Sequence, residues 1–174
     1  MQPPLTQITD KEGLDRAYKA PDGTYTYGKT LYVAGTRSAN DWLNNAWIPL
    51  GQTQRTPRYQ AVERALAANP KIVRVTGHSL GAAVAMEEGK RHPELKTRAY
   101  DAPVVQPIFM GWGNGERYRE FGDPVSIFDW GSHTSLPTSL NPHSYKRIAE
   151  QHYSEPTRHP DSWVDDQGVE HMLR

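Results

Sequence analysis

The stretch Ile72-Val73-Arg74-Val75-Thr76-Gly77-His78-Ser79-Leu80-Gly81-Ala82-Ala83 decides the fold of this chain. Its first five residues are mostly β-branched, which predicts a buried strand over Ile72–Thr76. The small residues that follow predict a helix over Gly81–Arg91, which ends before Pro93. Ser79 therefore lies in a tight turn between a strand and a helix.

The turn carries a G-x-S-x-G pentapeptide, Gly77 to Gly81. A serine hydroxyl is a poor nucleophile unless a base takes its proton and its oxygen stands clear of the backbone. A sharp strand-to-helix turn exposes the oxygen, and glycines on both sides avoid collisions with the neighbouring elements. The helix N-terminus also favours negative charge at this point. Ser79 is therefore predicted to be the nucleophile of a serine hydrolase.

Strand and helix patterns alternate on both sides of this stretch, which favours a mostly parallel central sheet flanked by helices. We expect a single α/β domain over residues 1–154, followed by a polar C-terminal extension, 155–174, with little structure. The predicted helices are Asp10–Ala20 and Tyr59–Asn69, and the predicted strands are Thr24–Tyr27, Thr30–Ala34, Thr97–Tyr100, Tyr118–Phe121 and Ser126–Phe128. The segment Val104–Glu116 is expected to be a loop.

The composition excludes several classes of protein. Twenty basic and twenty acidic residues give zero net charge, so the chain lacks the basic surface that nucleic-acid binding requires. No apolar stretch approaches the roughly 20 residues of a membrane span, and no signal peptide is visible, which favours a soluble, intracellular protein. The absence of cysteine excludes disulfides, a thiolate nucleophile and cysteine-bound zinc.

Four segments resemble the class 3 (fungal-lipase-like) lipase family of the α/β-hydrolase superfamily. Gly77-His78-Ser79-Leu80-Gly81-Ala82 is similar to the family's G-H-S-L-G-[GA] elbow, and the segment 35–42, GTRSANDW, resembles its R-G-[ST]-x-S-x-x-[DN]-W block. Ala102–Val105 and Gly122–Val125 resemble two further blocks, in the family's order. The resemblance implies a minimal α/β-hydrolase fold with a reduced lid.

A catalytic histidine must follow Ser79, because the triad order in α/β-hydrolases is serine, acid, histidine. His143 lies in a segment, residues 140–145, that resembles the family's H-S-x-x-Y loop, and it follows Asp123 by 20 residues. It is the preferred base, and His133 remains an alternative. The remaining downstream histidines are interpreted as surface residues.

The acid of the triad must hold the second ring nitrogen of the histidine. Asp123 follows a predicted strand and precedes Pro124, and active sites of open α/β sheets lie at the carboxyl ends of strands. Asp123 is the preferred acid, although Gly-Asp-Pro is also an ordinary turn signal. Asp129 and, less strongly, Asp101 remain alternatives.

The oxyanion hole needs two donors. The backbone N–H of Leu80, directly after the nucleophile, is one expected donor. The resemblance implies that Thr36, in the loop after the strand Thr30–Ala34, supplies the other. An ordinary Gly-Thr turn is the competing interpretation of Thr36.

Apolar residues between 42 and 50 recur at three- and four-residue intervals, so a helix there would present one apolar face. This face is either a short lid that contacts an acyl chain or part of the core. With the lid interpretation, Trp42, Trp47 and the elbow residue His78 are expected to contact the substrate. A hydrophobic acyl group, with transient contact to a lipid surface, fits this pattern.

The predicted function is hydrolysis of carboxylic esters, lipid or other hydrophobic acyl esters, through an acyl-enzyme on Ser79. This chemistry requires no metal and no organic cofactor. Phospholipase or acyltransferase activity on the same fold is one alternative. A catalytically silent hydrolase fold that serves as a binding module is another.

Overall fold

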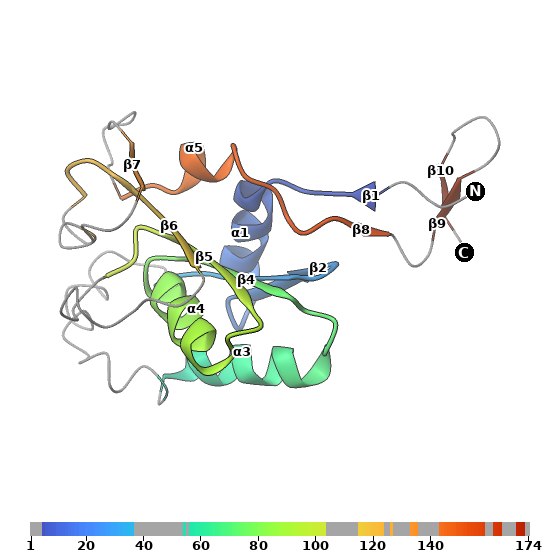
Figure 1. Cartoon of the computed structure of the whole chain (residues 1–174), viewed down its shortest axis with the longest axis horizontal. Helices are drawn as coiled ribbons and strands as arrows, with labels where there is room; N and C mark the ends of the chain where they lie inside the picture. The colour runs from blue at the N-terminus through green and yellow to red at the C-terminus, as the bar shows by residue number, and fades with distance from the viewer. Residues whose placement is uncertain are drawn as a thin grey trace.

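A six-stranded sheet forms the centre of the computed structural model (Figure 1). The structure describes residues 5–36, 54, 56–103, 115–123, 126, 133–135, 143–158, 162–164 and 170–172. Within these residues the strand order is β2-β3-β4-β5-β6-β7. The strands are β2 (Thr24–Tyr27), β3 (Thr30–Val33), β4 (Arg74–His78), β5 (Lys96–Tyr100), β6 (Gly115–Glu120) and β7 (His133–Ser135).

The strands β3 to β7 run parallel to one another, and β2 pairs antiparallel with β3 at one edge. This arrangement confirms the prediction of a mostly parallel sheet. Because parallel strands all end at the same edge, residues that follow β3, β4, β5 and β6 come close together there. That edge holds the candidate site.

Helices cover both faces of the sheet (Figure 1). Helices α1 (Asp10–Lys19) and α5 (Lys146–Ala149) lie on one face, and α3 (Pro57–Ala68) and α4 (Leu80–Arg91) lie on the other. Strand β3 is buried on both sides: Leu31 and Val33 pack in the core under α3 and α4, whereas Tyr32 packs in the core under α1 and α5. Two buried faces explain why β3 is a continuous run of apolar residues.

The helix ends follow local sequence signals. Thr9 caps α1 in a capping box, in which its side chain accepts from the Glu12 N–H and the Glu12 carboxylate accepts from the Thr9 N–H. Thr56 caps α3 by accepting from the Tyr59 N–H, with Pro57 in the first turn. The predicted helices are therefore confirmed, with bounds that differ by one or two residues.

Several predicted strands are displaced. Strand β4 begins two residues later than predicted. Ile72 and Val73 precede it without regular secondary structure, and the Val73 N–H donates to the Lys29 carbonyl. Strand β6 begins at Gly115, inside the expected loop. Strand β7 was not predicted, and of the expected strand Ser126–Phe128 only Ser126 is described, outside any strand.

The C-terminal extension has more structure than the sequence suggested. Strand β8 (Thr157–Arg158) pairs with β1 (Leu5–Thr6), and β9 (Ser162–Val164) pairs with β10 (Glu170–Met172). The Glu155 carboxylate accepts two hydrogen bonds from Arg74 on β4, at 2.6 and 3.0 Å. The first residues of the extension are thus tied to the central sheet.

No helix within the described ranges is both long enough and apolar enough to cross a membrane.

Candidate active site

Ser79 joins β4 to α4 in a strained conformation, with φ 55° and ψ −122°. Positive φ is uncommon for a residue with a side chain and persists where surrounding contacts enforce it. Here the Ser79 N–H donates to the Tyr100 carbonyl, and its own carbonyl accepts from the N–H groups of Ala82 and Ala83. This is the sharp strand-to-helix turn that the pentapeptide predicts.

The two glycines of the pentapeptide are required by close packing. A Cβ atom at Gly77 would lie 2.1 Å from the carbonyl oxygen of Gly81, and one at Gly81 would lie 2.2 Å from the carbonyl oxygen of Val33. Both distances are shorter than any real Cβ contact, and both partners are backbone atoms that cannot move aside. The predicted collisions are therefore confirmed.

The loop after β3 passes directly beside Ser79. A Cβ atom at Gly35 would lie 2.9 Å from the Ser79 Cβ and 2.9 Å from the His78 carbonyl oxygen. The Ser79 side chain is buried, and its hydroxyl has no hydrogen-bond partner among the described residues. The hydroxyl is thus available for a base or a substrate.

The predicted acid and base are in contact. His143 Nδ1 lies 3.1 Å from Asp123 Oδ1. The other carboxylate oxygen of Asp123 accepts hydrogen bonds from the hydroxyl and the N–H of Ser126, at 2.5 and 3.1 Å. Asp123 is fully buried, so these donors replace water around its carboxylate. Sequence reasoning did not find Ser126, whose signal is an Asp-x-x-Ser turn.

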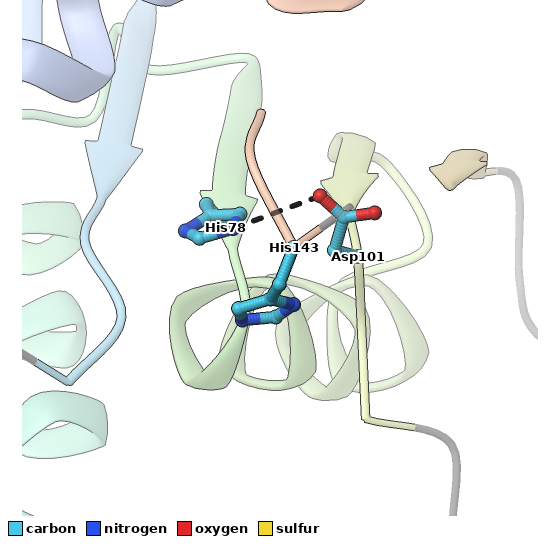
Figure 2. A group of neighbouring side chains, drawn as sticks. All are labelled: His78, Asp101 and His143. Carbon is cyan, nitrogen blue, oxygen red and sulfur yellow. Dashed lines mark ion pairs between the residues drawn. The ribbon is translucent and has the colours of Figure 1, made fainter. Parts of the chain in front are cut away.

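The His143 ring lies next to the serine turn. Its centroid is 4.9 Å from the ring of His78, the residue before Ser79, and Figure 2 shows the two rings side by side at the end of β4. The histidine reaches the same end of the sheet as the nucleophile although 64 residues separate them along the chain. The structure therefore brings the predicted histidine, acid and serine turn together.

His78 is packed among aromatic rings and 5% exposed. Its ring contacts Tyr145, with centroids 4.7 Å apart, and its Nδ1 lies 2.5 Å from the Tyr18 hydroxyl. Burial, with the neighbouring His143, holds the pKa of His78 well below its usual value, so the ring is neutral. This setting favours a role in holding the turn over the substrate contact expected from the sequence.

Tyr18 connects the serine turn to the loop after β3. Its hydroxyl contacts His78 Nδ1 and also accepts a hydrogen bond of 3.1 Å from the Gly35 N–H. Burial raises the pKa of Tyr18 to about 12, so the hydroxyl keeps its proton. No motif marks this residue, which lies on α1, far from Ser79 in the chain.

Asp101 follows β5 and is a second buried carboxyl at this edge, with φ 48°. Its Oδ1 accepts from the Glu120 N–H at 3.2 Å, and its Oδ2 lies 3.7 Å from His78 Nε2 (Figure 2). Burial, and then the charge of Asp123, raise the pKa of Asp101 well above its usual value. The alternative acid from the sequence analysis thus lies beside the preferred one, but its burial favours the protonated form.

The same three side chains, His78, Asp101 and His143, each offer a ligand atom within 4.8 Å of the others (Figure 2). They could hold a metal ion by distance alone. However, His143 Nδ1 is already in contact with Asp123, and burial disfavours the charged forms of His78 and Asp101.

The two predicted oxyanion donors border one cleft of about 430 Å³. The loop that carries Thr36 is held on both sides of Gly35, because Arg58 donates to the Gly35 carbonyl at 3.2 Å and Gly35 donates to Tyr18. Leu80 is the first residue of α4, where backbone N–H groups have no partner within the helix. The cleft is lined by Pro21, Asp22, Thr36, Thr56, Pro57, Arg58, Ala61, Arg64 and Leu80.

Other predicted residues are not placed. Trp42, Trp47 and Asp129 lie outside the described residues. His133 is the first residue of β7, and its side chain is likewise outside what the structure describes.

Comparison of the chain with protein-family models, with curated proteins and with solved structures finds no match. The resemblance to class 3 lipases therefore stays a prediction, and the functional argument depends on the geometry of the site.

Proposed function

We propose that this chain is a serine hydrolase that cleaves carboxylic esters of hydrophobic acyl groups. The observation that carries the proposal is the Asp123–His143 contact of 3.1 Å beside the strained Ser79 turn. The layered arrangement of helices and parallel strands is compatible with a minimal α/β-hydrolase fold. In such folds the nucleophile, acid and histidine occupy loops at the carboxyl ends of the strands.

In the first half of the proposed reaction, Ser79 Oγ attacks the ester carbonyl carbon while Nε2 of His143 takes the hydroxyl proton. Asp123 accepts from Nδ1–H, which fixes the ring and stabilises the imidazolium. His143 then gives the proton to the leaving alkoxide, so the alcohol departs and the acyl group remains esterified to Ser79.

In the second half, water attacks the acyl-enzyme while His143 takes one water proton. The tetrahedral intermediate collapses, His143 returns the proton to Ser79 Oγ, and the carboxylic acid leaves. In both halves the N–H of Leu80 and the Thr36 loop are the proposed donors to the oxyanion. Their shared position on one cleft supports this assignment.

Substitution of Ser79 tests the proposal. We expect Ser79→Ala to abolish hydrolysis of short p-nitrophenyl esters and labelling by a fluorophosphonate probe, because both require the Oγ nucleophile. Ser154→Ala is the matched control: Ser154 is also a buried serine, but its hydroxyl accepts from the Ile8 N–H. The control should keep both ester hydrolysis and labelling.

Two outcomes would contradict the proposal. Ester hydrolysis that survives in folded Ser79→Ala would show that another group is the nucleophile. A folded wild-type chain that neither hydrolyses esters nor reacts with the probe would instead support a catalytically silent binding module.

Phospholipase activity is the second candidate. Two arginines, Arg58 and Arg64, line the cleft that holds Thr36 and Leu80, and guanidinium groups favour anionic groups such as phosphate. A comparison of phospholipid with neutral glyceride hydrolysis separates the two activities. If a phosphate binds here, Arg64→Gln should raise KM for the phospholipid and leave KM for a neutral ester unchanged.

A further inference from the structure

A second group of polar side chains lies between α3 and α4, separate from the serine turn. It consists of Glu63 on α3, Glu88 on α4 and His92 directly after α4. Each offers one ligand atom, and these atoms all lie within 4.8 Å of one another. Figure 1 shows that both helices cover the same face of the sheet.

Glu88 is the unusual member of this group. Its side chain is fully buried, yet neither carboxylate oxygen has a hydrogen-bond partner among the described residues. A buried carboxylate without donors is costly, so such groups are normally paired, protonated or bound to a metal. A bound cation in contact with both oxygens would offset the cost of burying this carboxylate.

The neighbours of Glu88 are oriented as metal ligands usually are. His92 lies four residues after Glu88, and its Nε2 is 3.8 Å from Glu88 Oε2. The other ring nitrogen, Nδ1, lies 3.3 Å from the Glu94 carboxylate. A carboxylate on the far nitrogen of a ligating histidine fixes the ring and increases its basicity.

Glu63 completes the group from the other helix. Its Oε1 accepts from the Tyr59 hydroxyl at 3.1 Å and lies 3.8 Å from an Arg91 nitrogen. Arg91 also donates to the Tyr59 hydroxyl. Because the side chains of Arg91 and Glu63 are both partly exposed, the guanidinium lies on the solvent side of this cluster. Neither Tyr59 nor Arg91 forms a hydrogen bond with the Glu88 carboxylate.

We propose that Glu63, Glu88 and His92 form a binding site for a divalent transition-metal ion of the zinc type, which cross-links α3 to α4. Zinc accepts carboxylate and imidazole ligands at 2.0–2.2 Å, which places tetrahedral ligand atoms roughly 3.4 Å apart. The ligand atoms lie within 4.8 Å of one another, so the side chains would close around the ion to reach this value. Water can occupy the fourth position. The chain has no cysteine, so no disulfide can join these helices, and a bound ion would cross-link them instead.

Titration calorimetry with zinc chloride tests this site on the full chain, with magnesium chloride as a comparison. We expect one equivalent of zinc to bind and to raise the melting temperature, whereas magnesium should not bind, because it prefers all-oxygen octahedral sites. Glu94→Gln should weaken zinc binding by about 10- to 100-fold, the usual effect of losing a group that orients a ligand. Glu88→Gln and His92→Asn should weaken it more.

Two control variants make the test specific. Glu87→Gln removes the same charge from the neighbouring residue of α4, whose carboxylate contacts Gln54 and Lys90, and should leave zinc affinity unchanged. Asp101→Asn alters the other group that could hold a cation and should also leave it unchanged. His92 is partly exposed, so His92→Asn should fold even if the buried Glu88 variant does not.

The proposal is supported if one zinc equivalent is lost in the Glu88 and His92 variants and kept in both controls. It is overturned if wild-type protein shows no saturable zinc binding, if the Glu88 and His92 variants bind zinc like wild type, or if only Asp101→Asn loses it. The result does not depend on the proposed esterase activity, which Ser79→Ala tests separately.

Discussion

The hydroxyl of Tyr18 lies 2.5 Å from Nδ1 of His78, although 60 residues separate the two in the chain. The same hydroxyl accepts from the Gly35 N–H. One side chain on α1 therefore connects the residue before the nucleophile with the loop that carries the proposed oxyanion donor Thr36. Its effect on catalysis would come from the position of these two segments.

Replacing Tyr18 with Phe tests this connection. We expect kcat for ester hydrolysis to fall about 10-fold or more, because a small displacement of an oxyanion donor is costly in the transition state. KM should change little, since the variant keeps the aromatic ring. Steady-state kinetics and the melting temperature should be measured together. Tyr27→Phe, which removes a hydroxyl that donates to Thr6, is the matched control; equal kcat losses in both variants would argue against the connection.

The Asp123–His143 contact leads to a second prediction. Asp123→Asn keeps the shape of the side chain but lets the amide donate to Nδ1, which favours the wrong histidine tautomer. We expect kcat to fall by about 10⁴-fold with little change in fold, the effect known for this substitution in serine-protease triads. Ester kinetics and circular dichroism provide the measurement. Glu94→Gln, at an exposed carboxylate outside the cleft, should retain full activity.

If Asp123→Asn loses less than about 10-fold, another carboxyl must support His143. Asp101 would be the first to examine, because one of its carboxylate oxygens lies within 4.8 Å of a His143 ring nitrogen.

The sequence predicted the parts of the site that depend on consecutive residues. The Ser79 turn follows from a strand, a pentapeptide and a helix in direct succession. The Asp123 assignment follows from its place after a predicted strand, and the His143 assignment from the resemblance of residues 140–145 to a family loop. Tyr18 could not be predicted, because its contacts with His78 and Gly35 arise only when α1 packs on the sheet. Asp101 was weighed as an acid, but its raised pKa depends on burial beside Asp123, which no pattern of residues reveals.

The differences in the fold have similar physical causes. Ile72 and Val73 have the β-branched side chains typical of a strand, yet both precede β4. Ile72 is buried there, and Val73 is partly exposed. Strand β7, His133–Ser135, is short and polar, so it lacks the alternation that would reveal it. Its place comes from pairing with β6, a long-range contact.

A buried ion pair under α1 gives a stability prediction. The Asp10 carboxylate accepts from Arg98 and from the Tyr100 hydroxyl, both at 2.8 Å, and is fully buried. Asp10→Asn should lower the free energy of unfolding by about 3 kcal/mol, because the buried Arg98 guanidinium loses the negative charge of the Asp10 carboxylate. Urea denaturation measures this loss. The partly exposed Asp15→Asn should cost far less, and a similar cost in both variants would contradict the argument.

The raised pKa of Asp101 predicts how stability depends on pH. His78, Glu120 and Asp123 surround this carboxyl. In the unfolded chain the pKa of Asp101 has its usual value of 3.8. In the folded chain, burial and the charge of Asp123 raise this pKa, so the carboxyl keeps its proton to a higher pH. The folded state therefore holds an extra proton. The contribution of this proton to the free energy of unfolding is fully present below pH 3.8. It is lost as the pH rises toward the pKa of Asp101 in the folded state.

Asp101→Asn removes this dependence, because the amide is neutral at every pH. Relative to wild type, the variant should gain stability as pH rises above about 4, until Asp101 of the folded wild-type protein ionises, and the two curves should differ only by a constant offset at the acid end. Urea denaturation of both proteins across this range measures the difference. Groups distant from Asp101 titrate alike in both proteins and cancel in the difference. A difference that stays constant over the whole range would show that Asp101 is ionised in the folded protein, and the site would then contain two charged carboxylates beside His143.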